Sequence, residues 1–183
     1  MRILWLKTEL LHPIDKGGRI RSYQMLRELA RNHEITYLTL DDGSAAPDAA
    51  ERAAEYCHVL ERIAFRTTPK DSLRLYGDLL RNLPSRLPYA VAKYASPAMR
   101  QRVTELARPD RHDVLVCDFL FPSQNVPARL PVPTVLFQHN VETMIWKRHA
   151  ETAVNPLARW YYGLQAKRLE RAEGWFCRNM RHV

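Results

Sequence analysis

The sequence predicts a doubly wound α/β domain, in which helices cover both faces of a mostly parallel β-sheet. Short apolar runs of strand length alternate along the chain with longer segments of helical period. The later runs, "DVLVCDF" and "PTVLFQH", are almost continuously apolar. Such runs are typical of parallel strands that are buried on both faces.

The chain opens with a strand, a helix and a second strand. "RILWLK" (2–7) is an apolar run that ends in Pro and Gly punctuation, and the pattern over 18–32 is helical. One face of this helix collects Ser22, Met25, Leu26 and Leu29. "EITYLTL" (34–40) alternates β-branched and aromatic residues and stops at the turn "DDGS". This βαβ unit predicts parallel strands joined by a right-handed crossover.

The middle of the chain predicts a second helix over 47–56 and a third strand over 59–65. The Leu- and Arg-rich stretch 71–107 follows. It is broken into several short helices by Pro84, Pro88 and Pro97.

The last third of the chain predicts two central strands, 113–119 and 133–139, and a long closing helix. One stripe of that helix is apolar and consists of Ala158, Tyr162, Leu169, Ala172 and Phe176. A second stripe is basic and consists of Lys167, Arg171 and Arg178.

The length and the composition of the chain indicate one domain over residues 1–183. The net charge of +8 favours an anionic partner, which leaves nucleic acid, a phosphate-bearing ligand and an acidic membrane surface open. The sequence has no apolar run of about 18 residues and no signal-peptide pattern, so we expect a cytoplasmic protein. The three cysteines lie far apart, which favours reduced thiols over a disulfide framework or a zinc site.

The glycine pair Gly17 and Gly18 stands between the first strand and the first helix. Glycine allows backbone N–H groups to approach a ligand closely, and a helix N-terminus favours phosphate or a hydroxyl-rich ligand. Arg19 and Arg21 follow directly. A tight turn before a helix is the alternative explanation. "KGGRIR" matches neither GxGxxG nor a P-loop, which disfavours a dinucleotide dehydrogenase or a P-loop NTPase.

His139 ends the last predicted strand, where the strand ends of a parallel sheet form a ligand crevice. An imidazole there can orient a substrate hydroxyl, or it can be a satisfied residue of the turn. Asn140 suits the N-cap of the next helix and Glu142 its first turn. No GxSxG or HExxH motif occurs, so covalent hydrolase or zinc-protease chemistry has little support.

The stretch 1–40 resembles the amino-terminal half of a family 4 glycosyltransferase of the GT-B type, and "PTVLFQHNVETMIWKR" resembles its His-Asn-x-Glu segment. The likeness runs in order through the whole chain. It implies a Rossmann-like domain that receives the acceptor and faces, in the complete enzyme, a second domain that holds the nucleotide sugar. Such enzymes serve glycan, polysaccharide or glycolipid biosynthesis and are generally retaining.

The resemblance also implies roles for individual residues. Gly17 and Gly18 match the loop that approaches the donor phosphates, with Arg21 beside it. His139 matches the histidine at the reaction centre, with Asn140 and Glu142 in the same binding segment. Positioning and stabilisation of the departing diphosphate would carry the reaction, with a nucleotide sugar as substrate and no metal or cofactor.

The chain ends where this family would begin its sixth strand. We therefore expect the donor-binding domain to be missing and the chain alone to be inactive. The chain would then be the product of a truncated reading frame, a fragment or one part of a split enzyme.

Two further partners stay open at this stage. The stretches 73–94 and 160–176 combine basic and aromatic residues, so they can rest on a membrane that carries a lipid-linked acceptor or can simply cover the sheet. A nucleic-acid-binding module is motivated by net charge alone, without a recognised motif, and we expect no nucleic-acid partner. A regulatory module that pairs with a separate donor domain is the remaining alternative.

Overall fold

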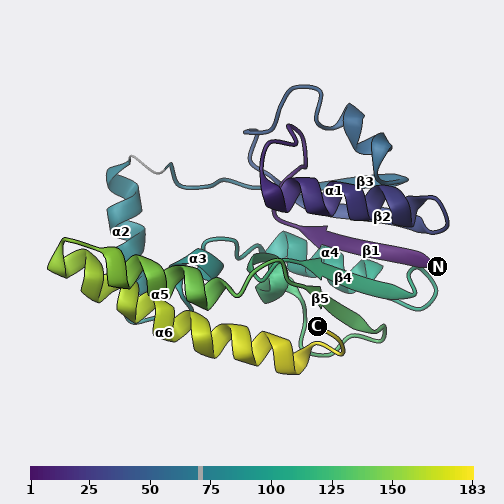
Figure 1. Ribbon diagram of the computed structural model, residues 1–183. Coiled ribbons are helices and arrows are strands. Elements are labelled where there is room, and N and C mark those ends of the chain that lie inside the picture. Colours follow the sequence, from purple (N-terminus) through teal and green to yellow (C-terminus); the bar gives the residue numbers. More distant parts are fainter. Residues whose placement is uncertain (70–71) are drawn as a thin grey trace.

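The centre of the molecule is a five-stranded, all-parallel sheet (Figure 1). The computed structural model describes residues 1–69 and 72–183. The strand order is β3-β2-β1-β4-β5. The chain therefore winds outward from β1 in both directions, and the order reverses between β1 and β4. The strands are β1 (Arg2–Lys7), β2 (Glu34–Asp41), β3 (Val59–Ala64), β4 (Val114–Asp118) and β5 (Thr134–Phe137).

Helices cover both faces of the sheet, which confirms the predicted doubly wound fold. The helices are α1 (Gly17–Ala30), α2 (Leu73–Asn82), α3 (Tyr89–Ala92), α4 (Pro97–Leu106), α5 (Glu142–Thr152) and α6 (Pro156–Asn179). Side chains of α1 and of the 3-10 helix η1 (Glu51–Glu55) pack on one face. Side chains of α3, α4 and α6 pack on the other face.

The alternation of side chains along β1 supplies both halves of the core. Ile3 and Trp5 join the cluster under α1, whereas Leu4 and Leu6 join the cluster under α4 and α6. Because successive residues of a strand point to opposite faces, an apolar run without polar interruption fits a strand that is covered on both sides.

The strand β5 is an edge strand, so the predicted central position of 133–139 is wrong, and only four residues of that range are in the strand. Its outer edge is partly covered by the end of the chain. The backbone of His182 lies parallel to β5, with a bridge to Val135 and a 2.9 Å hydrogen bond from the Leu136 N–H to the His182 carbonyl. This cover accounts for the apolar character of an edge strand.

The predicted helix over 47–56 is also wrong, because only the five-residue η1 forms there. The N–H groups of Ala53 and Tyr56 donate to carbonyls three residues earlier, which is the tighter 3-10 pattern. The predicted closing helix is confirmed as α6, which begins at Pro156 behind an Asn155 cap and follows the separate helix α5. Asp71, the first residue of the predicted run of short helices, lies outside the described residues.

Among the described residues, no helix is both long enough and apolar enough to span a bilayer. In Figure 1, α5 and α6 form an antiparallel pair whose turn projects beyond the sheet, and α2 lies at the same end of the molecule.

Candidate functional site

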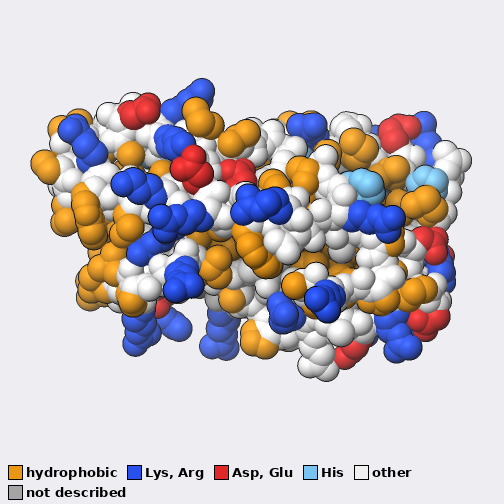
Figure 2. All heavy atoms as spheres, turned by 90° about the horizontal axis from the view of Figure 1, so that it is seen from below, with side chains coloured by type: hydrophobic (Ala, Val, Ile, Leu, Met, Phe, Trp, Pro, Cys, Tyr) orange, Lys and Arg blue, Asp and Glu red, His pale blue; other side chains and the backbone are white. Residues whose placement is uncertain are grey.

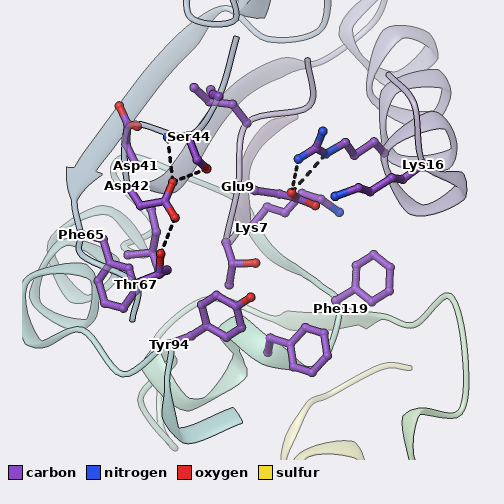
Figure 3. Close-up of a pocket in the computed structure, with 16 residues that line it drawn as sticks. Lys7, Glu9, Lys16, Asp41, Asp42, Ser44, Phe65, Thr67, Tyr94 and Phe119 are labelled. Atoms are coloured by element: carbon purple, nitrogen blue, oxygen red, sulfur yellow. Dashed lines mark hydrogen bonds and ion pairs between the residues drawn. The ribbon is translucent and has the colours of Figure 1, made fainter. Parts of the chain in front are cut away.

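A hollow of about 290 Å³ opens at the carboxyl end of the sheet (Figure 3). Most of its lining residues end or follow four different strands: Lys7 to Leu10 at the end of β1, residues between Leu40 and Ala45 at the end of β2, Phe65 and Thr67 after β3, and Phe119 and Phe121 after β4. We call it the sheet-edge hollow. Loops that follow parallel strands converge in this way because all the strands end at the same edge. The segment after β5, which carries His139, does not line this hollow.

Aromatic rings and charged groups face each other across the sheet-edge hollow. Phe65, Tyr94, Phe119 and Phe121 supply the rings. Figure 3 shows the carboxylates of Glu9 and Asp42 on the opposite side from Tyr94. A site of this composition offers flat apolar surfaces together with hydrogen-bond acceptors.

The carboxylates of the hollow are held by their neighbours. The Arg19 guanidinium donates to the Glu9 carboxylate at 2.6 Å. Asp42 accepts hydrogen bonds from the Ser44 backbone and hydroxyl and from the Thr67 hydroxyl at 2.8 Å. Burial would raise the pKa of Asp42, but these hydrogen bonds outweigh it and lower the pKa. The Asp42 carboxylate is therefore ionised and fixed in place.

The sheet-edge hollow continues toward α2 and α3 as a larger groove of about 750 Å³. Glu9, Lys16, Arg19, Asp42 and Tyr94 line both parts. The groove adds polar and charged side chains from the far side, namely Arg66, Thr68, Asp78, Arg81, Asn82 and Lys93. A ligand larger than one small ring therefore fits along the same surface.

A buried polar network lies beneath the hollow and centres on Asp118, the last residue of β4. The Asp118 carboxylate is fully buried and accepts four hydrogen bonds. The donors are Trp5 Nε1 at 3.0 Å, Lys7 Nζ at 2.9 Å, the Ser22 hydroxyl at 2.6 Å and His139 Nε2 at 2.8 Å. These donors come from β1, α1 and the end of β5, so the network ties three elements to β4.

The electrostatics of this network favour an ionised Asp118. Burial acts to raise its pKa, but the hydrogen bond from His139 and the charge and hydrogen bond of Lys7 outweigh that effect and lower the pKa. Burial also lowers the pKa of Lys7, and the Asp118 charge offsets part of this change. An ionised Asp118 can only accept, so the proton of a neutral His139 ring resides on Nε2 and leaves Nδ1 as an acceptor.

Phe119 connects the predicted glycine pair to the predicted histidine. Its backbone has a φ of +73°, a region that bulky residues rarely adopt. The Phe119 ring stacks on the His139 ring at a centroid distance of 4.1 Å. An added Cβ on Gly18 would lie 2.8 Å from the same Phe119 ring. Gly18 and His139 therefore pack on one side chain, as expected if the two motifs share a site.

The other predicted residues near the first helix are placed differently. Gly17 is exposed, and a Cβ there would meet nothing within 4 Å. Arg21 is also exposed, and its guanidinium lies 5.2 Å from the Phe137 ring centroid, whereas Arg19 lines the hollow. Of the two arginines considered, the structure places Arg19, and not Arg21, at the hollow.

His139 does not line the sheet-edge hollow, because the Phe119 ring lies between them. It lines a second hollow of about 600 Å³ between the end of β5 and the pair α5 and α6, together with Gln138, Met144 and Glu173. The His139 side chain is 4% exposed, and its Nδ1 has no hydrogen-bond partner among the described residues. This nitrogen is itself buried, so the ring presents no open polar atom to either hollow.

The predicted N-cap role of Asn140 is wrong. Asn140 is exposed, and α5 begins at Glu142 behind Val141, without a side-chain cap from its own segment. Glu173 of α6 takes this role, since its carboxylate accepts from the N–H groups of Glu142 and Thr143. A carboxylate from a neighbouring helix thus satisfies the donors that we had assigned to a local cap.

Glu142 lies in the first turn of α5, as predicted, and is buried rather than open to a ligand. Burial raises the pKa of Glu142 to about 6, and the neighbouring Glu173 charge adds to this effect. Glu142 is thus a carboxyl group that changes charge close to neutral pH.

Sequence reasoning missed the residues at the centre of the site, Lys7 and Asp118. A signal was present, because "RILWLK" and "VLVCD" are apolar strands that each end in a charged residue. Charged residues are rarely buried unless they are paired, so two such strand ends of opposite sign point to each other. Ser22 stood on the predicted core face of the first helix, where a hydroxyl needs a partner.

The fold and this site define the chain as a single Rossmann-like α/β domain with its candidate site at the carboxyl ends of the parallel strands. Comparison with models of protein families, with curated proteins and with solved structures found no match.

Proposed function

We propose that this chain is the acceptor-side domain of a glycosyltransferase of the GT-B type, and that the sheet-edge hollow binds a sugar acceptor. The observation that carries the proposal is the pairing of aromatic rings with fixed carboxylates in one hollow. Sugar rings have apolar C–H faces and hydroxyl rims. Aromatic planes such as Tyr94 pack on the faces, and ionised carboxylates such as Asp42 accept from the hydroxyls.

The arrangement of Asp42 supports this function because the carboxylate is already oriented. Ser44 and Thr67 occupy part of its acceptor capacity, and Asp42 lines the hollow (Figure 3). The free-energy cost of ordering the carboxylate on binding is smaller when it is already held in place than when the ligand must order it. Lys16, which is exposed at the start of α1, places positive charge beside the same hollow, whereas Arg19 is already paired with Glu9 and Asp15. The charge of Lys16 suits the diphosphate of a nucleotide-sugar donor.

On this proposal, a second domain holds the nucleotide sugar, and the sugar passes to an acceptor hydroxyl with retention. His139 supports the hollow from behind Phe119, because its ring stacks on the Phe119 ring and its Nε2 donates to Asp118. No metal or organic cofactor is required, because positioning and charge stabilisation of the leaving diphosphate carry the step. The chain alone then binds acceptor without turnover.

Binding of a sugar panel tests the proposal. Saturation-transfer NMR with mono- and disaccharides should show contacts for the parent chain, and Asp42→Asn and Tyr94→Ala should each weaken binding by about tenfold. Asp110→Asn is the matched control, because Asp110 is an exposed carboxylate that precedes β4 at the opposite end of the sheet. Absence of contacts for every sugar, or equal weakening by the control, would contradict the proposal.

A separate experiment tests the proposal that turnover requires a second domain. The purified chain is incubated with a panel of nucleotide sugars and with any saccharide that binds in the NMR experiment. We expect no hydrolysis and no transfer, and turnover of any donor would show that no second domain is needed.

A further inference from the structure

Helix α2 turns its apolar stripe toward solvent. Leu73, Tyr76 and Leu80 are 88%, 64% and 66% exposed, and their spacing of three and four residues places them on one face of the helix. The buried residue of α2 is the polar Asn82. Two further apolar residues, Leu75 and Leu79, are half-buried on the opposite face, so α2 is apolar on both sides, and the exposed face lacks a partner within the described chain.

A second group of exposed apolar side chains lies at the turn between α5 and α6. Val154, Leu157 and Trp160 are 92%, 72% and 57% exposed. Figure 1 shows this turn and α2 at the same end of the molecule. The Arg168 guanidinium donates to the carbonyls of Asn82 and Leu83, which fixes the end of α2 on α6. We call Leu73, Tyr76, Leu80, Val154, Leu157 and Trp160 the apolar end.

The charge around the apolar end is strongly positive. Residues 72–93 and 144–171, which carry these side chains, contain ten Lys or Arg and three Asp or Glu. The net charge of the whole chain is +8, so these two segments hold nearly all of the surplus. Figure 2 shows Lys and Arg side chains interspersed with apolar ones over this end of the molecule. An acidic surface is therefore the complementary partner.

We infer that the apolar end docks on the surface of a bilayer that contains anionic lipids. Exposed Leu side chains and the amphipathic rings of Tyr76 and Trp160 suit the boundary between headgroups and acyl chains. The surrounding arginines are attracted to anionic headgroups. On this inference the molecule lies on the bilayer surface.

This docking would bring the candidate site to the membrane. The groove that extends the sheet-edge hollow is lined by Asp78, Arg81 and Asn82 of α2, so it opens beside the helix that meets the lipid. An acceptor carried on a lipid would reach the groove from the bilayer surface. This step alone rests on the proposed sugar-transfer function, whereas the docking itself does not.

Flotation with vesicles tests the inference. The chain should float with phosphatidylcholine vesicles that contain phosphatidylglycerol, and much less with phosphatidylcholine alone. High salt should weaken the binding, because screening removes the electrostatic part. The triple variant Leu73→Ser, Tyr76→Ser, Leu80→Ser and the triple variant Val154→Ser, Leu157→Ser, Trp160→Ser should each reduce partitioning by about tenfold or more.

The matched control is Ile20→Ser with Met25→Ser, two exposed apolar residues of α1, which should leave partitioning unchanged. Circular dichroism checks that each variant is folded.

Failure to float with anionic vesicles at low salt would overturn the inference, as would an equal loss of partitioning in the control variant. A dimer in light scattering that the first triple variant dissolves, without vesicle binding, would assign the surface to self-association instead. Sugar binding by NMR is measured separately, so failure of one proposal is distinguishable from failure of the other.

Discussion

Asp118 and Glu142 are two buried carboxylates whose surroundings differ in kind. Asp118 lies on the floor of the site with a lysine, a histidine, a serine and a tryptophan as donors. Glu142 lies at the start of α5, where its nearest charged neighbour is another carboxylate, Glu173. Burial acts in the same direction on both pKa values, but the net pKa falls for Asp118 and rises for Glu142.

The difference shows that partners, rather than burial, decide what a buried carboxyl group does. The four donors of Asp118 keep it ionised, so it acts as a fixed anion that orients Lys7 and His139. Glu142 has no such donors among the described residues, and its charge therefore depends on pH. The charge of Asp118 is therefore constant near neutral pH, whereas the charge of Glu142 changes with pH.

Removal of the Asp118 charge should have the largest effect on stability. Asp118→Asn leaves Lys7 buried without a counter-ion, and we expect the free energy of unfolding to fall by about 3–5 kcal/mol. Urea denaturation at neutral pH measures this loss. Asp113→Asn is the matched control, since Asp113 precedes the same strand and forms an exposed pair with Arg2, which solvent screens, so its loss should be much smaller. Equal losses in the two variants would show that the network is not a stabilising feature.

The packing above Asp118 provides the second prediction. A methyl group on Gly18 meets the Phe119 ring, which is held between Gly18 and His139, so Gly18→Ala should destabilise the chain by about 1–3 kcal/mol. Gly17→Ala is the matched control, because its Cβ meets nothing, and it should be neutral or stabilise by about 0.4–1 kcal/mol. Thermal unfolding of both variants checks this difference. Similar behaviour of the two would mean that the Phe119 ring moves without cost.

The fold was largely predictable because strand and helix periods depend on local sequence. All five strands lie within one or two residues of their predicted bounds, since each carries a clear run of apolar or β-branched residues. The place of β5 in the sheet was not predictable. The residues that cover its edge, Arg181 and His182, are polar and contribute through their backbone, which leaves no pattern in the side chains.

The candidate site was predictable only in part. Glycines and a histidine next to strand ends indicated the correct edge of the sheet, because that edge follows from topology. The network beneath it depends on contacts between residues about a hundred positions apart, such as Lys7 and Asp118. The cap of α5 by Glu173 is of the same kind, since a local motif pointed to Asn140 and a distant carboxylate took its place. Long-range polar pairing does not appear in a local pattern.

Glu142→Gln tests the pH-dependent side of the comparison and should have the smallest effect. The ordinary pKa of this carboxyl group is 4.5 and its pKa in the fold is about 6, so the folded state holds the proton more tightly than the unfolded state. Ionisation therefore costs stability: the full penalty, about 2 kcal/mol at most, is present above pH 6 and disappears as the pH falls below 4.5.

The amide cannot ionise, so Glu142→Gln should stabilise the chain at pH 7.5 and leave it unchanged near pH 4. Urea denaturation across this pH range measures the difference between the two proteins, and Glu151→Gln, on an exposed position of α5, is the control. A stabilisation that is equal at both pH values would show that the amide acts through hydrogen bonding rather than charge. Glu142 would then be as constant a feature of the site as Asp118, and the contrast between the two carboxylates would no longer hold.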